Sequence, residues 1–591
     1  MRRKPQLLTV LLALLCGLSS LLSGGSTAFS QVATETEPAE APTAEPFFEA
    51  VHVEVVNIDV WVTDKQGKPV DGLGKDDFVV LQDGQPVEVT NFYAVAGGRP
   101  VSESPDDDAP APAPAPVVRH PRSREPLVAP EHRLWLIVYI DNYNLDPIER
   151  DRVLPALETF LGRTLQTGDQ AMIVTFKRSL DVRQPFTDQL AQLRSALGTL
   201  RKESGLAVVR DRERADTLQQ IDQAGSGSSA LTYARQYAEE QMNGVGYTVD
   251  ALQRLIDTLA GLPGRKALLH VSSGIPMLAG EEMFHAVAEK HGLTQAYSEI
   301  PRHDTTRRFE RVIRRANEQR VTFHTMDAGG LRGMEFGAAE YAGFVDMDLR
   351  STLDSVVPEN LQSPLRLMAN QTGGRAILNR NEVLPALDEV AQDFRSFYSL
   401  GVSSADVDSG RYHRLEVKLS ERRRGVSLRH RGGYRSKSLD TRIRESLQSA
   451  LLYAHQENRL DVVLRLGEAR AQGDKGLYLL PIQVQVPLRD VVLLPTQTGK
   501  QEARLELFVG AVGQDSRPSA IQDTPFGVRL ADEHVEAARS ESLLHGHKLL
   551  LSRGRQKIGV AVLDLFSGQA SVVTAFVDVG PSEDDSASQG P

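Results

Sequence analysis

Apolar and polar residues alternate in two widely separated parts of the chain, a pattern typical of strands with one buried face. In the first part, Val51, Val53 and Val55 alternate with polar neighbours, and turns rich in Asp and Gly follow. Period-2 strands separated by such turns predict a small β-domain over about 47–95. Similar patterns recur after about residue 460 and predict a sandwich-like β-domain over 460–580.

Between these two parts, continuous apolar runs alternate with segments of helical periodicity. Residues 134–140 (LWLIVYI) form one such run, which is typical of a strand buried on both faces of a parallel sheet. Leu154, Leu157 and Leu161 then recur at helical spacing. Repeated strand–helix alternation predicts an α/β domain over 131–435, with a doubly wound, mostly parallel sheet and a β extension at its end.

Segments of biased or polar composition separate and interrupt these domains. A polar insertion covers about 202–245, and we interpret its Gly/Ser run at 225–229 as flexible. Residues 96–130 are expected to form a stiff, extended linker, because Ala and Pro alternate there after a run of Asp. The remaining expected segments are a disordered leader (31–46), the linker (96–130), a helical connector (436–459) and a disordered tail (581–591).

The first residues of the chain, 1–30, predict a secretory signal peptide. A basic start is followed by an apolar run, and small residues then offer cleavage after Ala28 or after Ser30. The apolar run is shorter than the roughly 20 residues that span a bilayer, which favours cleavage over anchoring. We therefore expect a secreted or periplasmic protein with no transmembrane segment after its signal peptide.

Composition excludes several kinds of chemistry. Cys16 is the only cysteine and lies within the expected signal peptide, so thiol catalysis and cysteine-ligated metal sites are not expected. A net charge of −11 and 6% aromatic residues do not suit sequence-independent binding of nucleic acid. Neither a Ser/His/Asp pattern, nor paired carboxylates, nor histidines at zinc spacing emerge from the sequence. We therefore expect a protein that is not an enzyme and has no catalytic residues.

One carboxylate lies where a sheet of this class binds ligands. Asp141 directly follows the apolar run 134–140, and ligands of doubly wound sheets bind at the carboxyl ends of strands, near the switch in strand order. Asn142 and Asn144 add oxygen-bearing side chains that suit a hard divalent cation. Alternatively, Asn144 or Asp146 caps the following helix, and we prefer this role for Asp146.

Taken in order, several motifs resemble the von Willebrand factor A-like domains of an exported bacterial subfamily. The resemblance covers about residues 50–435 and implies the same α/β fold. Its motifs are 62–67 (VTDKQG), Asp77-Phe78, Asp83-Gly84, 262–268 (LPGRKAL), 326–331 (MDAGGL), 369–375 (ANQTGGR), 397–401 (FYSLG) and 431–434 (RGGY).

The resemblance also implies a metal-ion-dependent adhesion site at the strand ends. In such domains the site is built from Asp-x-Ser-x-Ser, a threonine and a second aspartate, and an acidic group of the partner completes the magnesium shell. Here Tyr143 and Leu145 stand at the serine positions, so the site is degenerate, and a single carboxylate among neutral groups weakens cation binding. The candidate magnesium ligands are Asp141, Asn142, Asn144, Thr248 and Ser273.

These observations together predict an exported protein-interaction or adhesion protein. We expect it to bind a protein partner outside the cytoplasm through the strand-end face of the α/β domain, with magnesium as the one candidate cofactor. A metal-independent envelope scaffold is the alternative interpretation, and an exported hydrolase is a less favoured one.

Overall fold

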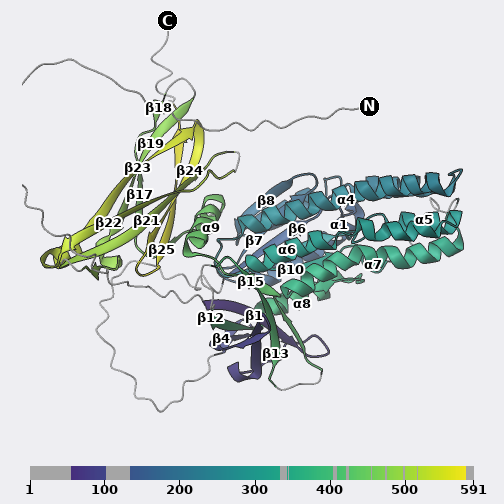
Figure 1. The fold of residues 1–591 in the computed structure, drawn as a ribbon, viewed down its shortest axis with the longest axis horizontal. Coiled ribbons are helices and arrows are strands. Elements are labelled where there is room, and N and C mark those ends of the chain that lie inside the picture. The colour runs from purple at the N-terminus through teal and green to yellow at the C-terminus, as the bar shows by residue number, and fades with distance from the viewer. Residues whose placement is uncertain are drawn as a thin grey trace, which may run out of the picture. The chain divides into compact units, whose positions relative to one another are not determined.

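The computed structural model describes most of the chain from Val55 onward (Figure 1). The expected signal peptide, leader and tail, together with most of the linker, lie outside the described residues. The described residues are 55–101, 133–332, 343, 345–403, 409–420, 425–453, 455–472, 476–496, 499–514 and 517–580. In this part of the chain, no helix combines the length and the apolar character needed to cross a membrane.

A six-stranded sheet forms the centre of the α/β domain. Its spatial order is β11-β10-β9-β6-β7-β8, and all neighbours are parallel except β7 and β8. Numbered along the chain, this is the doubly wound order 3-2-1-4-5-6, which confirms the predicted fold class and places the switch between β6 and β9. The strands are β6 (Leu134–Ile140), β7 (Gln170–Phe176), β8 (Leu180–Thr187), β9 (Arg265–Ser272), β10 (Val321–Asp327) and β11 (Ala376–Ile377).

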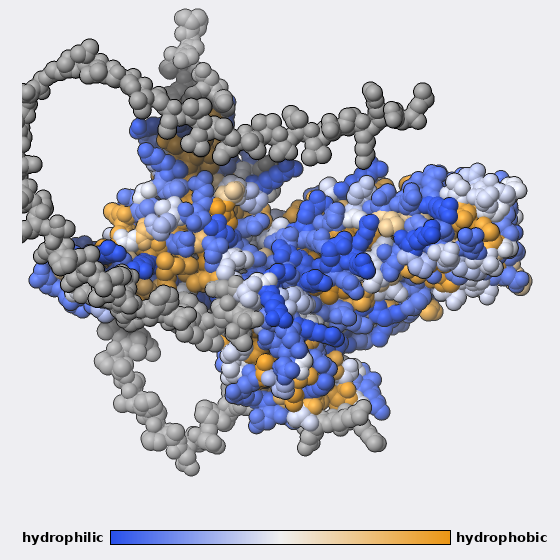
Figure 2. Space-filling model, viewed as in Figure 1, coloured by the Kyte–Doolittle hydropathy of each residue, from blue (hydrophilic) through white to orange (hydrophobic). Residues whose placement is uncertain are grey.

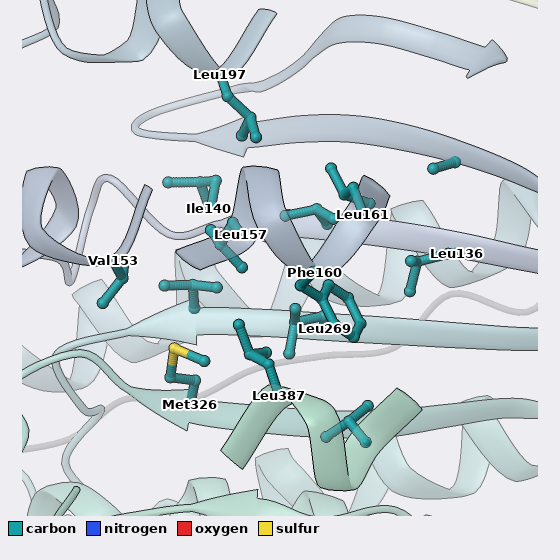
Figure 3. Packing of buried hydrophobic residues seen from close by; sticks show 14 of the residues in the cluster. Leu136, Ile140, Val153, Leu157, Phe160, Leu161, Leu197, Leu269, Met326 and Leu387 are labelled. Carbon is teal, nitrogen blue, oxygen red and sulfur yellow. The ribbon is translucent and has the colours of Figure 1, made fainter. Parts of the chain in front are cut away.

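Helices cover both faces of this sheet, because successive side chains of each strand point to opposite faces. Leu136 and Ile140 of β6 pack among α1, α2 and α8 (Figure 3), whereas Trp135 and Ile137 pack among α4, α6 and α7. All seven residues of β6 are buried, as its continuous apolar run predicts. The helices are α1 (Pro147–Thr164), α2 (Leu190–Leu200), α4 (Gly227–Thr258), α6 (Thr306–Glu318), α7 (Met347–Thr372) and α8 (Val383–Arg395).

A second group of helices extends the α/β domain beyond its sheet. It comprises α3 (Ala207–Asp222), the first half of α4, α5 (Glu281–His291), the 3₁₀ helix η3 (Thr294–His303) and the first half of α7, and it has its own apolar core. The flexible insertion expected at 225–229 was wrong, since Ser226 caps α4 by accepting a hydrogen bond from the backbone of Ser229. Alanines such as Ala230 and Ala234 contribute to the buried face of this part of α4. The sequence therefore lacks the stripe of large apolar residues that would have predicted a helix here.

The N-terminal strands do not form a separate domain over 47–95. They share two sheets with the β extension of the α/β domain, in the orders β14-β1-β12-β4-β5 and β15-β13-β2-β3, and both sheets enclose one core. Pairing also continues to Val101, inside the expected linker. The strands are β1 (Val55–Thr63), β2 (Phe78–Gln82), β3 (Gln85–Val87), β4 (Val89–Ala96), β5 (Arg99–Val101), β12 (Phe397–Ser403), β13 (Tyr412–Leu419), β14 (Ser427–His430) and β15 (Gly433–Arg435).

The C-terminal strands form two further antiparallel sheets around a common core, consistent with the predicted sandwich-like domain. Helix α9 (Leu439–Leu452) lies in the expected connector and packs on one sheet, where Lys557 Nζ donates to the carbonyl oxygens of Ala450 and Tyr453 near its end. The strands are β16 (Glu457–Asn458), β17 (Val463–Leu466), β18 (Arg470–Gln472), β19 (Leu477–Pro487), β20 (Leu494–Pro495), β21 (Lys500–Val512), β22 (Gln522–Ala531), β23 (Ser542–Ser552), β24 (Gly554–Asp564) and β25 (Ala570–Val579), with a short α10 (Val535–Ala538).

Surface hydropathy differs between these parts of the chain. In the view of Figure 2, hydrophobic residues gather over strands of the C-terminal domain, whereas the helices of the α/β domain present mainly hydrophilic residues. Phe576 on β25 is one exposed aromatic residue of the C-terminal domain. The guanidinium of Arg555 lies 4.9 Å from the centre of its ring, so a cation partly shields this ring from water.

A buried carboxylate ties the N-terminal two-sheet unit to the α/β domain. Asp393 on α8 is 1% exposed, and its two oxygens accept from both guanidiniums of Arg375 and Arg429 at 2.7–2.9 Å. Trp61 Nε1 on β1 donates to the backbone oxygen of the same residue at 2.8 Å. Burial acts to raise the pKa of Asp393, but the two guanidiniums outweigh it, so the pKa lies below its usual value.

Replacing Asp393 by Asn is expected to destabilise the protein by about 3–5 kcal/mol, because it removes the buried carboxylate that pairs with two partly buried guanidiniums. Since the pKa of Asp393 is lowered in the folded state, this contribution is complete above the unfolded pKa and is lost as the pH falls through the folded one. Urea unfolding at several pH values measures both effects.

Asp388→Asn is the matched control, because Asp388 lies on the same helix but forms an exposed ion pair with Arg163 at 3.5 Å. Its loss is expected to cost less than about 1 kcal/mol. Equal destabilisation by the two substitutions would contradict the role assigned to Asp393.

Candidate functional site

Asp141 lies at the carboxyl end of β6, beside the switch in strand order. Its backbone N–H donates to Val271 of β9 at 3.0 Å, and its side chain is completely buried. Oδ1 accepts from the backbone N–H of Asn144 at 3.2 Å, and Oδ2 accepts from the Asn144 side chain at 2.7 Å. His270 Nε2 and Ser272 Oγ lie 3.3 and 3.5 Å from the same Oδ2. Hydrogen bonds from protein groups therefore surround this carboxylate.

Asn144 connects Asp141 to helices α4 and α3. Its side-chain nitrogen donates to Asp141 and also to Thr248 Oγ1 of α4, at 3.0 Å. Its side-chain oxygen accepts from Nη1 of Arg210, on α3, at 2.6 Å. Three of the residues proposed from the sequence, Asp141, Asn144 and Thr248, are thus brought together.

The other two proposed ligands lie elsewhere. The Asn142 side chain donates to Glu203 at 3.0 Å and accepts from Arg150 at 3.4 Å. Ser273 Oγ accepts from the backbone of Asp146 at 3.0 Å and donates to the carboxylate of Glu149. The neighbouring Ser272, and not Ser273, lies beside Asp141.

Asp146 has the capping role preferred from the sequence. Its Oδ1 accepts from the backbone N–H groups of Ile148 and Glu149, at 2.7 and 3.3 Å, at the start of α1. The first turn of α1 is thereby held next to the end of β6, and Glu149 is brought to Ser273.

The residues around Asp141 do not fit a divalent cation. Mg²⁺ is held by oxygen ligands that include carboxylates, whereas here one carboxylate accepts hydrogen bonds on both oxygens. The guanidinium of Arg210 already binds the one amide oxygen that Asn144 offers. Among the described residues, no group of three or more His, Cys, Asp or Glu side chains has the arrangement of a metal site.

A cavity of about 280 Å³ opens at this edge of the sheet, between the strand-end loops and helices α3, α4 and α7. Asn144 and Ser273 belong to its wall, so the cavity adjoins the site described above. Its charged lining residues are Arg210, Arg214, Arg332, Asp146, Glu149, Asp211 and Glu282. The cavity was not foreseen from the sequence, because eight of its eighteen lining residues come from the helical extension.

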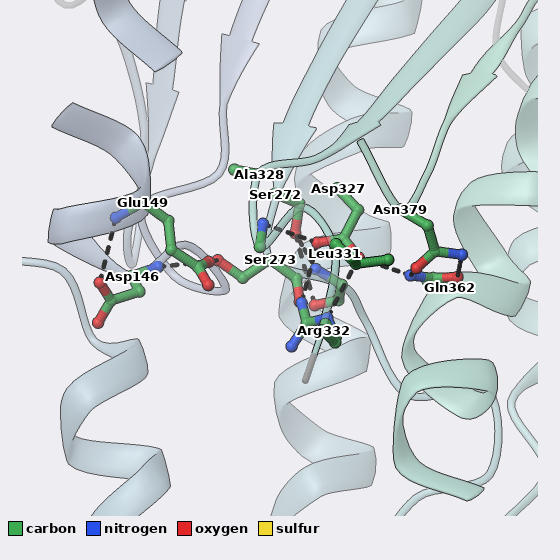
Figure 4. Close-up of polar contacts among 12 residues, drawn as sticks. Asp146, Glu149, Ser272, Ser273, Asp327, Ala328, Leu331, Arg332, Gln362 and Asn379 are labelled. Atoms are coloured by element: carbon green, nitrogen blue, oxygen red, sulfur yellow. Dashed lines mark hydrogen bonds and ion pairs between the residues drawn. The ribbon is translucent and has the colours of Figure 1, made fainter. Parts of the chain in front are cut away.

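One side of the cavity is organised by Asp327, at the end of β10 (Figure 4). Its carboxylate accepts from Arg332 at 2.9 and 3.2 Å and from Gln362 at 2.8 Å. Arg332 also donates to the backbone oxygen of Ser273, which links the ends of β9 and β10. The pKa of the nearby Glu149 carboxyl is raised, because burial outweighs two opposing effects. These are the hydrogen bond from Ser273 and the charge of Arg332, which both lower the pKa.

No family model matches the chain, and no curated protein matches it. Solved structures do show similarity. The von Willebrand factor domain of the type V pili tip protein Mfa5 from Porphyromonas gingivalis is 12% identical, with 44% of this chain and 94% of that chain covered and a TM-score of 0.23.

Two further solved structures show a similar degree of likeness. The manganese-loaded TRAP protein of Plasmodium vivax is 8% identical, with 52% and 96% of the two chains covered and a TM-score of 0.22. An aerotolerance-related membrane protein from Bacteroides fragilis is 10% identical, with 44% and 98% covered and a TM-score of 0.19. By the order of its sheet and the motifs along it, the α/β domain of this chain is von Willebrand factor A-like in fold.

Proposed function

We propose that this protein is an exported binding protein that holds a protein partner at the strand-end face of its α/β domain without a metal ion. The observation that carries the proposal is that three exposed apolar residues, which we call the rim residues, adjoin residues of the cavity wall along the chain. Ile148, Val208 and Leu331 are 82%, 53% and 65% exposed. Each adjoins a cavity-lining residue in the chain: Glu149, Ala207 and Arg332, respectively.

Exposed apolar residues beside a polar cavity favour contact with a protein partner, because such contact removes apolar surface from water. Single exposed apolar residues are common, but a group of them around a concave site is typical of an interaction surface. The location supports the same conclusion, because the cavity lies at the strand ends beside the switch point, where doubly wound sheets bind ligands. The proposal of an extracytoplasmic setting rests on the signal-peptide pattern of the first thirty residues.

A binding role is favoured over catalysis by the arrangement of the polar residues. Asp141, His270 and Ser272 lie together but are all completely buried. Ser272 Oγ approaches Asp141 and not His270, so the histidine is not placed to take a proton from the serine. These three residues therefore support the sheet edge instead of forming a nucleophilic triad.

Site-specific photo-crosslinking in the producing organism tests the partner face. A photoreactive residue placed at Ile148, Val208 or Leu331 is expected to form an adduct with the same protein from all three positions. Val463 on the C-terminal domain is the matched control, since it is an exposed valine of 44% exposure on a different domain. The proposal fails if the three rim positions give no adduct or if Val463 gives the same one.

The metal-independent character is tested by thermal unfolding. Adding Mg²⁺ or Mn²⁺ at millimolar concentration to protein treated with a chelator is expected to shift the melting temperature by less than about 1 °C. A cation that binds only the folded state would raise the melting temperature progressively as its concentration increased. A rise that saturates with metal concentration would show that the site accepts a cation.

A further inference from the structure

We propose that Arg210 is the receptor for a carboxylate side chain of the protein partner, an inference that rests on the function proposed above. Arg210 lies on α3 and lines the cavity. Its Nη1 donates to Asn144, and its guanidinium lies 5.2 Å from the centre of the Tyr143 ring. The side chain is thus held from two sides while it forms part of the cavity wall.

Arg210 differs from the other two arginines of the cavity in its charge balance. Arg214 pairs with Asp211 at 3.3 Å, and Arg332 pairs with Asp327 at 2.9 Å. Arg210 forms no ion pair with any residue that the structure describes, and its buried Nε has no hydrogen-bond partner there. Among the described residues, no ion pair therefore neutralises the guanidinium of Arg210 at the cavity wall.

The carboxylates of the cavity are engaged by other groups. Asp146 caps α1, and Glu282 accepts from the hydroxyl of Tyr237 at 3.2 Å. Glu149 accepts from Ser273. Burial also raises the pKa of its carboxyl. None of these three carboxylates forms an ion pair with Arg210 among the described residues.

The chemistry of a guanidinium selects a planar anion. Its donors form a rigid fork that matches the two oxygens of a carboxylate, and such paired charge-assisted hydrogen bonds are among the stronger polar contacts in proteins. Asn144 and Tyr143 hold the guanidinium in place, which lowers the entropy that binding must offset. The cavity of about 280 Å³ has room for a Glu or Asp side chain.

The probe for this site is N-acetyl-glutamic acid α-amide, with N-acetyl-glutamine α-amide as its uncharged counterpart. Saturation-transfer NMR with the full chain is expected to detect saturable binding of the acid and not of the amide. Arg210→Gln is expected to weaken that binding about tenfold or more, because it removes the charged donors. Arg212→Gln, an exposed arginine on the same helix, is expected to leave it unchanged.

Arg210→Lys keeps the positive charge but loses the fork, and it provides the comparison if Arg210→Gln does not fold. We expect it to bind the acid more weakly than the wild type. The inference is overturned if the acid binds equally well to the wild type, Arg210→Gln and Arg210→Lys. It is also overturned if the wild type binds the acid and the amide equally well.

Crosslinking from the rim separates this inference from the proposed function. If rim adducts form but the acid does not bind through Arg210, the carboxylate receptor is wrong and the partner face stands. If the acid binds through Arg210 but no rim adduct forms, the receptor stands for a free carboxylate ligand and the protein partner is wrong.

Discussion

The arrangement of the whole strand-end face depends on satisfying one buried carboxylate. Asp141 is completely enclosed, and a buried charge is tolerated only when hydrogen bonds replace the water it has lost. Asn144 supplies two of those bonds, one from its backbone and one from its side chain. The nitrogen of the amide must then face Asp141 and Thr248, so the oxygen faces Arg210. The need to hydrogen-bond the buried Asp141 therefore determines where the guanidinium of Arg210 is held in the cavity wall.

Local sequence pattern predicts the central fold well, because its strands and helices are each encoded by adjacent residues. The run 134–140 announces a strand that is buried on both faces, and the structure has that strand at Leu134–Ile140. The N-terminal β-unit could not be predicted in the same way. Val55 pairs with Ser403, and Val60 with Tyr398, across more than three hundred residues. A local alternation shows that β1 is a strand but contains no information about so distant a partner.

The candidate site was predictable to the extent that it follows from strand ends. Asp141 could be located because it terminates β6, and Asn144 follows it in the same loop. Ser272 was missed by one position, since the parallel register sets Ile140 opposite Val271 and so brings Ser272, not Ser273, level with Asp141. Arg210 was missed for a different reason. It lies on a helix of the polar insertion 202–245, whose weak apolar periodicity concealed the helix.

An arginine and a metal ion can both provide positive charge that binds a carboxylate, but the protein holds them in different ways. A divalent cation needs several oxygen ligands, usually with more than one carboxylate, and it must be taken up from solution. Arg210 is part of the chain, and Asn144 and Tyr143 position its guanidinium. Binding at this edge would then be independent of metal supply. It would weaken only as salt screens the more exposed part of the contact. A strand-end edge whose described residues do not fit a divalent cation can therefore still present a positively charged centre.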